Sequence, residues 1–156
     1  MIKCIVDTKS LKNNQKTYDA CLVAKESIIN SFYQHGKSVE ILARNKILEP
    51  PKTGNIYYIH ELKRNHQASA PGQAPANMLG NLQKSLTYAV GPSEMYFGSS
   101  DKYYDVYYAE DLELGNDRIK PRPYLKPSIR ETQGDLQGEF YTQLRKGFGI
   151  WHLKKL

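Results

Sequence analysis

His60 and His66 are the first candidates for chemical function, because histidine can bind metals or transfer protons. Five residues separate His60 from His66, and no third ligand stands at helical or zinc-finger spacing, whereas zinc sites use three or four protein ligands. Glu110, Asp111 and Glu113 offer carboxylates for a metal or for acid–base catalysis. No histidine or lysine accompanies them in a glycine-rich turn, so we expect a solvated helix face rather than an active site.

Nucleophiles and phosphate-binding motifs give no stronger signal. Ser69 and Ser85 lie in no nucleophile elbow, and no loop of the Gly-x-x-x-x-Gly-Lys type occurs. Cys4 and Cys21 are the only two cysteines and belong to no metal or redox motif, which favours reduced packing residues. The sequence therefore predicts that the chain is not an enzyme and uses no cofactor or metal.

Tyrosine is unusually frequent, with 12 Tyr against 4 Phe and 1 Trp. Tyrosine pairs occur at positions 57 and 58, 103 and 104, and 107 and 108. Such rings could stack on single-stranded bases beside lysine and arginine. They also suit half-buried positions and protein interfaces, because each ring is apolar and each hydroxyl is polar. We favour core and interface packing.

Length and charge bound the class of protein. The 156 residues predict one domain spanning 1–156. The net charge of +6 and the pI of about 9.2 permit an anionic partner without demonstrating one. No apolar run long enough to span a membrane occurs, and the early Lys3 and Asp7 argue against a signal peptide. We therefore expect a protein made in the cytoplasm, without a membrane partner.

The first half of the chain predicts a long helix followed by short strands. Apolar residues recur at helical spacing from Tyr18 to Ile47, and the expected helix ends before Pro50. Gly36 lies within it and is a potential bend. A helix of this length needs a sheet or a neighbouring subunit to cover its apolar stripe. After it we expect a strand at 56–62, a short helix at 79–86, and a hairpin of strands at 87–90 and 94–98.

The second half predicts two further helices. Tyr104, Tyr107, Tyr108 and Leu112 share one helix face within 101–114, and Gly115 is the expected C-cap. Prolines make 118–123 extended, and a helix then runs from Pro127 to Gly147, weakened at Gly134 and Gly138. Residues 1–10 form a tail or strand, and residues 148–156 a tail with Trp151 as its anchor. The expected fold class is α+β, a small mainly antiparallel sheet with the long N-terminal helix and a C-terminal helix packed on it.

One stretch, residues 65–83, contains no Asp, Glu, Lys or Arg, although charged residues make up 24% of the chain. Pro71, Gly72 and Pro75 exclude a regular helix through its first half. Its small residues bury too little apolar area for the stretch to fold on itself. It is either a mobile loop or an extended arm that lies against another surface. We favour an arm that is disordered in the monomer and adds to a neighbouring subunit through main-chain hydrogen bonds.

Charges are segregated farther along the chain. Between 101 and 117 there are six acids against the single Lys102, and between 118 and 130 there are five bases and no acid. Alternate residues of an extended segment face the same way, so Arg118, Lys120 and Arg122 would form a basic stripe. We hypothesise that this stripe meets the acidic face of the next subunit. The alternative is that both blocks pair within one chain or stay solvated.

Several segments resemble the tailed-phage neck family, also called tail-component or tail-completion proteins. The first three are Pro51-Lys52-Thr53-Gly54 before a tyrosine-rich strand, Ala68-Ser69-Ala70-Pro71-Gly72-Gln73-Ala74-Pro75-Ala76, and Gly80-Asn81-Leu82-Gln83-Lys84-Ser85-Leu86. The others are Tyr108-Ala109 with Glu113-Leu114-Gly115, and Arg122-Pro123-Tyr124-Leu125-Lys126-Pro127. The resemblance covers residues 45–145. Asn116 follows Gly115 where members usually have Thr, and Met78-Leu79 replaces a usual Asp-Thr pair.

The resemblance implies a small α+β virion protein that forms a ring in the neck, joins the head connector to the tail, and lets DNA pass. Its implied partners are copies of itself, in six- or twelve-fold symmetry, and the head-completion or adaptor and tail-terminator or tail-tube proteins, with non-specific DNA in the channel. Rings need heterologous contacts between different patches. The candidate interface residues are Ala68, Ser69, Ala70, Pro71, Gly72, Gln73, Ala74, Pro75, Glu110, Asp111, Glu113, Arg118, Lys120 and Arg122.

A second function class remains open from the sequence, a basic nucleic-acid-binding module. Lys146, Lys154 and Lys155 would be its phosphate-contacting tail. Affinity for DNA that falls steeply with salt is expected of such a module. A multimer that binds DNA weakly is expected of the ring.

Overall fold

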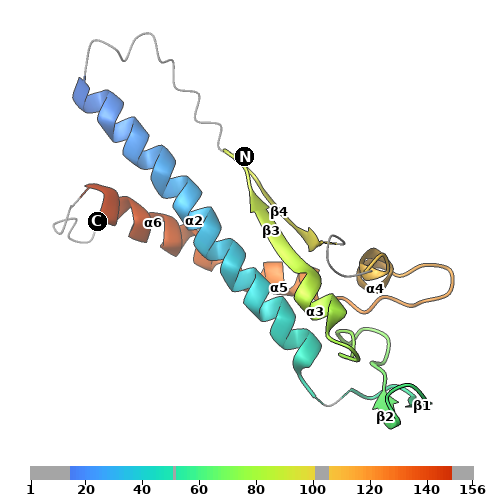
Figure 1. The fold of residues 1–156 in the computed structure, drawn as a ribbon. Coiled ribbons are helices and arrows are strands. Elements are labelled where there is room, and N and C mark those ends of the chain that lie inside the picture. Colours follow the sequence, from blue (N-terminus) through green and yellow to red (C-terminus); the bar gives the residue numbers. More distant parts are fainter. Residues whose placement is uncertain (1–14, 51, 101–105, 149–156) are drawn as a thin grey trace.

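The computed structural model describes residues 15–50, 52–100 and 106–148. In chain order its elements are α2 (Gln15–Leu48), β1 (Ile56–Ile59), β2 (Arg64–Gln67), α3 (Asn81–Ser85), β3 (Leu86–Val90), β4 (Met95–Ser99), α4 (Ala109–Leu114), α5 (Leu125–Thr132) and α6 (Asp135–Phe148) (Figure 1). The predicted α+β class is confirmed. Its strands form two separate antiparallel ribbons, β1–β2 and β3–β4.

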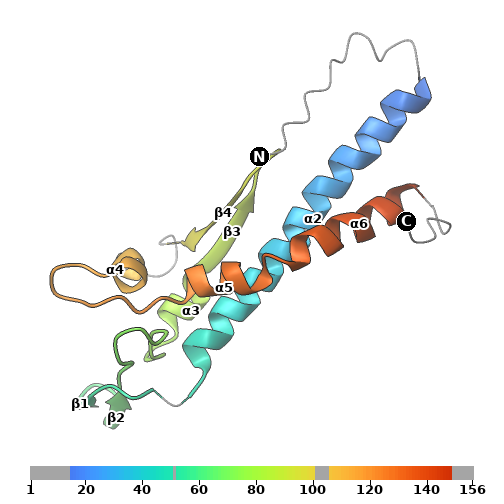
Figure 2. The same ribbon diagram turned by 180° about the vertical axis from the view of Figure 1, so that it is seen from behind.

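The long helix α2 is the axis on which the other elements pack. Apart from Gly36, its buried residues recur every four positions, namely Ser27, Ser31, His35, Val39, Ala43 and Ile47. Because four residues turn an α-helix through about 400°, this row winds slowly around α2. The N-terminal part therefore packs on α6, where Gly147 lies against Val23. The C-terminal part packs on α5 and β3, as the opposite views of Figures 1 and 2 show.

Gly36 serves close packing within an uninterrupted helix. A Cβ atom at this position would lie 2.6 Å from Cε2 of Tyr88 on β3. Glycine, which has no Cβ, therefore allows the Tyr88 ring to pack directly on the helix backbone. The seam between α2 and α6 is polar. The buried His35 has an Nδ1 atom without a hydrogen-bond partner in the described chain. Burial lowers the pKa of His35, and Asp135 and Glu139 of α6 act in the opposite direction.

The hydrophobic core joins the C-terminal half of α2 to the middle of the chain. Its buried residues are Ala43, Ile47, Leu82, Leu86, Val106 and Tyr124. Leu82 lies on α3 and Leu86 begins β3, so the predicted short helix and the predicted hairpin are both confirmed. Tyr124 is 2% exposed. Burial raises the pKa of its hydroxyl, and Glu113 and Tyr108 add to the effect.

Two helix predictions need correction. The helix expected over 101–114 is described only from Ala109, because Tyr107 and Tyr108 form a turn before it, while Gly115 is its C-cap as predicted. The C-terminal helix is divided into α5 and α6 at residues 133–134. Gly134 weakens a helix by about 1 kcal/mol relative to alanine, so the chain turns where helix formation is least favourable. Residues 1–14, Pro51, 101–105 and 149–156 lie outside the described residues, together with Cys4, Trp151, Lys154 and Lys155.

Candidate interaction site

The uncharged stretch 65–83 is not a free arm. Its first residues belong to β2, which pairs with β1 so that Tyr57 faces His66, and its last residues belong to α3. Between them the backbone returns to its own chain. Gly54 N–H donates to Ala68 O, and Ala68 N–H donates to Asn55 O, both at 2.9 Å. The prediction of an extended arm that is disordered in the monomer is therefore wrong.

Hydrogen bonds replace the apolar area that the stretch lacks. The side-chain oxygen of Gln73 accepts from the backbone N–H groups of Thr53 and Ala70, each at 3.0 Å. Gly72 N–H donates to Pro121 O at 2.9 Å. Ser69 is 3% exposed. Small residues permit this approach, since a Cβ on Gly54 would lie 2.6 Å from Ser69 O.

Glu113, predicted to face a neighbouring subunit, instead holds the start of α5. Its Oε2 accepts from the N–H groups of Tyr124 at 2.8 Å and Leu125 at 2.9 Å, and its Oε1 accepts from Lys126 N–H at 2.7 Å. The first N–H groups of a helix have no partner within the helix, and a carboxylate is favourable there. Glu113 is thus a helix cap supplied from eleven or more residues upstream.

The predicted basic stripe does not form. Asn116 Oδ1 accepts from the N–H groups of Arg118 and Ile119, each at 2.8 Å, and this makes a turn where an extended segment was expected. Arg118 and Lys120 are exposed, whereas Arg122 is half-buried and donates from Nε to Ser69 O at 3.2 Å. The prediction fails because a short Asn side chain bonds the backbone N–H groups that follow it. Among the described residues, neither the Arg44–Glu40 ion pair nor the Lys46–Glu131 ion pair joins the acidic and basic blocks.

We call the place where residues 68–75 meet Arg122 the loop junction, and we include Glu113, which binds the N–H groups of residues 124–126 just after Arg122. Arg122 N–H also donates to Leu112 O at 2.7 Å, which ties α4 to the same place. Within residues 68–75, Ser69 and Pro75 are buried and Pro71 and Gly72 are exposed. Of the other predicted interface residues, Glu110 is exposed and Asp111 half-buried on α4. The structure therefore brings together ten of the candidates and leaves Glu110, Asp111, Arg118 and Lys120 outside the junction.

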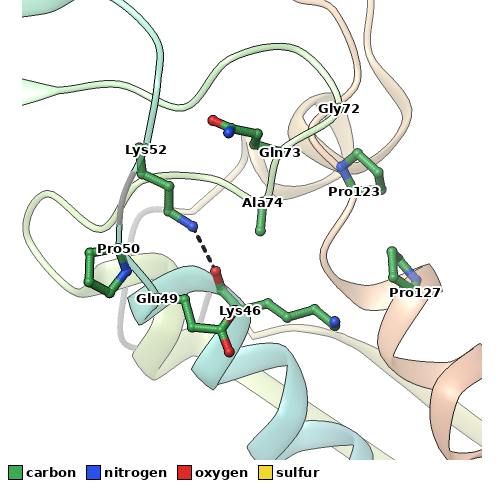
Figure 3. Close-up of a pocket in the computed structure, with 9 residues that line it drawn as sticks. All are labelled: Lys46, Glu49, Pro50, Lys52, Gly72, Gln73, Ala74, Pro123 and Pro127. Atoms are coloured by element: carbon green, nitrogen blue, oxygen red, sulfur yellow. Dashed lines mark hydrogen bonds between the residues drawn. The ribbon is translucent and has the colours of Figure 1, made fainter.

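A cleft of about 310 Å³ lies beside the junction, at the C-terminal end of α2. Figure 3 shows its lining residues: Lys46, Glu49, Pro50, Lys52, Gly72, Gln73, Ala74, Pro123 and Pro127. Both of its lysines are engaged. Lys46 Nζ pairs with Glu131 at 2.8 Å, and Lys52 Nζ donates to Lys46 O at 2.8 Å. Burial lowers the pKa of Lys52, which Glu49 partly offsets. Because both lysines already bind groups of this chain and three prolines line the cleft, we do not interpret the cleft as an anion-binding site.

No metal or membrane feature emerges from the described residues. Within 15–50, 52–100 and 106–148, no three His, Cys, Asp or Glu side chains gather closely enough to hold a metal ion. No helix in the same ranges combines the length and the apolar character needed to cross a bilayer. His66 lies in β2. The ring of His60 packs edge-on against the ring of Tyr58, with 5.0 Å between the ring centroids. Cys21 is a free, half-buried thiol on α2.

The sequence did not reveal the β1–β2 hairpin, which exposes the large apolar side chains of Ile56, Tyr57 and Tyr58. Only its first strand was expected, because β2 reads Arg-Asn-His-Gln and has no apolar alternation. Three residues of each four-residue strand are exposed. Ile56 and Tyr58 are 64% and 53% exposed. The sequence signal for this exposed surface was the presence of Ile56 and Tyr58 on one strand face, followed by a polar segment that could not cover them.

The chain was compared with protein-family models, with curated proteins and with solved structures, and none of the three comparisons finds a match.

Proposed function

We propose that this chain is a structural virion protein of a tailed phage, forming a ring in the neck that joins the head connector to the tail and lets DNA pass. The ring has no chemistry of its own. Copies of the chain, in six- or twelve-fold symmetry, are its first partners. The head-completion or adaptor protein and the tail-terminator or tail-tube protein are its neighbours above and below.

One observation carries the proposal. Three of the segments that resemble neck proteins, 51–54, 68–76 and 122–127, lie apart in the sequence, yet they are in contact. Thr53 N–H donates to the Gln73 side chain, and Arg122 donates to Ser69 O. Segments that share both a family resemblance and a mutual contact are expected to preserve one local architecture, rather than to match by chance.

The exposed apolar surface supports assembly. Tyr107, Ile56 and Leu114 are 78%, 64% and 61% exposed. Exposed apolar side chains that lie together, as Ile56 and Tyr58 do on β1 and Tyr107 and Leu114 do beside and on α4, suit burial against other subunits. Lys146, at the end of α6, is also exposed. A DNA-binding module would use such residues, so the experiment must separate the two functions.

The test is the mass of the purified chain by native mass spectrometry, together with a titration of double-stranded DNA at several salt concentrations. The proposal predicts a discrete multimer of the 17.9 kDa chain and weak DNA binding. A chain that stays monomeric and binds DNA tightly, with an affinity that falls steeply as salt rises, would instead support the nucleic-acid-binding module.

A further inference from the structure

The β1–β2 hairpin lacks a second layer. Its register pairs Ile56 with Gln67 and Tyr58 with Asn65. These four side chains share one face because alternate residues of a strand point the same way, and all four are exposed. An isolated two-stranded hairpin is marginally stable at best in water. We call this the outer face of the hairpin.

The chemistry of the outer face points to a protein partner. None of its four residues carries a formal charge, although the chain has a net charge of +6. A surface that follows a phosphate backbone needs a row of lysines or arginines. Here the cations stand only at the tip, Lys63 and Arg64, beside the single acid Glu61. Arg64 Nη2 donates to Met78 O at 3.0 Å, and the guanidinium keeps its other donors.

A surface with the opposite charge to the hairpin tip lies on and beside α4. Tyr107, Glu110 and Leu114 stand at positions i, i+3 and i+7, and all three are exposed, which makes a partly apolar ridge. Residues 106–117 contain four acids and no base. We call this the acidic ridge. It borders a cleft of about 440 Å³ that Phe97 of β4 and Leu125 of α5 also line.

We propose that the hairpin of one copy of this chain docks on the acidic ridge of the next copy in the ring. Ile56 and Tyr58 enter the apolar cleft beside the ridge. Lys63, at the tip of the hairpin, faces Glu110 and Asp117, and the neighbouring Arg64 adds positive charge, so that the two cations set the orientation of the contact. This inference rests on the proposed ring and names its subunit interface.

A second copy fits both surfaces better than any other occupant. The hairpin lies beyond the C-terminal end of α2, and α4 lies apart from it at the side of the β3–β4 ribbon, in both views (Figures 1 and 2). The two surfaces are therefore different patches of one chain. Contacts between different patches are heterologous, and heterologous contacts form a ring when the rotation between neighbouring copies closes.

The first experiment reverses charges and then restores them. Lys63→Glu with Arg64→Glu, and separately Glu110→Lys with Asp117→Lys, should each raise the apparent dissociation constant of the multimer by about thirtyfold or more, as the loss of an interface hot spot does. All four changes in one chain should restore assembly. Circular dichroism checks that each variant is folded. Matched reversal of Arg118 and Lys120 to glutamate should leave assembly unchanged.

The second experiment mixes two variants. A hairpin variant, Ile56→Asp with Tyr58→Asp, keeps an intact ridge, and a ridge variant, Glu110→Lys with Leu114→Lys, keeps an intact hairpin. Each alone should be monomeric, and an equimolar mixture should form a species of two chains and no larger one. Only a heterologous contact between these two patches gives that result.

The outcomes separate this interface from the ring itself. If the wild-type chain is monomeric at every concentration, the proposed function fails and the interface with it. If the wild-type chain assembles while the reversed and mixed variants behave like wild type, only the hairpin–ridge contact is overturned. Variants that assemble normally but lose DNA binding would assign the hairpin to nucleic acid and also overturn the contact.

Discussion

The loop at 68–75 and the outer face of the hairpin at 56–67 are neighbours in sequence, and neither carries a charged residue, yet they differ in what they contact. Backbone and side-chain groups of the loop bond to other parts of the same chain, including Thr53, Pro121 and Arg122. The hairpin bonds mainly to itself and leaves Ile56 and Tyr58 uncovered. The absence of charge therefore identifies a contact segment, but it does not say whether the contact is made within one copy or between copies.

The difference arises from side-chain size. Gly54 lets its backbone approach that of Ala68 and Ser69 until N–H and C=O groups meet, so the junction is completed without apolar bulk. Ile56 and Tyr58 are large and apolar, and their removal from water requires a second surface. The junction is thus expected to respond to mutation in the monomer, and the hairpin only in the assembly.

The largest expected effect is at Gly115, the glycine that ends α4 beside the junction. Gly115 has φ of 79° and ψ of 165°, and a Cβ there would lie 2.9 Å from Ile119 O. Gly115→Ala should lower the free energy of unfolding by about 3 kcal/mol. The control is Gly72→Ala, at φ of 83° with nothing within 4 Å, which should cost only about 1 kcal/mol. Urea denaturation measures both. Equal losses would show that crowding at Gly115 is unimportant.

The next effect is at the helix cap. Glu113→Ala removes the acceptor for three N–H groups at the start of α5 and should destabilise the monomer by about 2 kcal/mol. Glu110→Ala on the exposed side of α4 should change stability by less than about 0.5 kcal/mol. Thermal unfolding of the two variants under conditions that keep the chain monomeric is the comparison. If Glu113→Ala does not lower the stability of the monomer, the three hydrogen bonds of Glu113 do not contribute to the junction.

The next, smaller effect on monomer stability is expected from Gln73 of the loop junction, for which Gln67 of the hairpin is the comparison. Gln73→Ala loses two hydrogen bonds of the junction and should cost about 1 kcal/mol. Gln67→Ala loses one 3.3 Å bond from β2 to Gly54 O and should cost less than about 0.5 kcal/mol. Limited proteolysis should cleave the Gln73 variant within residues 68–75 faster than wild type. Identical digestion of both variants would contradict the difference between the regions.

The smallest effect on the monomer is expected on the outer face of the hairpin. Tyr58→Ser should change the free energy of unfolding by less than about 0.5 kcal/mol, because the ring is exposed and packs on His60 alone among described aromatic rings. The same change should weaken assembly. Chemical denaturation of dilute protein and mass measurement of concentrated protein give the two values. Strong destabilisation of the dilute monomer would mean that Tyr58 is part of the fold.

Sequence periodicity predicted the elements whose residues repeat regularly. It placed α2, β1, α3 and the β3–β4 hairpin, because apolar spacing and prolines determine them locally. It missed β2, whose four residues are polar, and the α5–α6 break, which the helical spacing of Ile129, Leu136 and Phe140 conceals. It also assigned Glu113 and Arg122 to a neighbouring subunit. Their partners lie eleven and fifty-three residues away, and such distant pairing has no local signal.

Hydrogen–deuterium exchange, followed peptide by peptide in the dilute monomer and in the assembled protein, tests the central claim most directly. The account predicts that amides of residues 56–67 become more protected on assembly, together with those of 107–114, while amides of 68–75 are equally protected in both states. Protection gained by residues 68–75, with the hairpin unchanged, would contradict the account and restore the free arm.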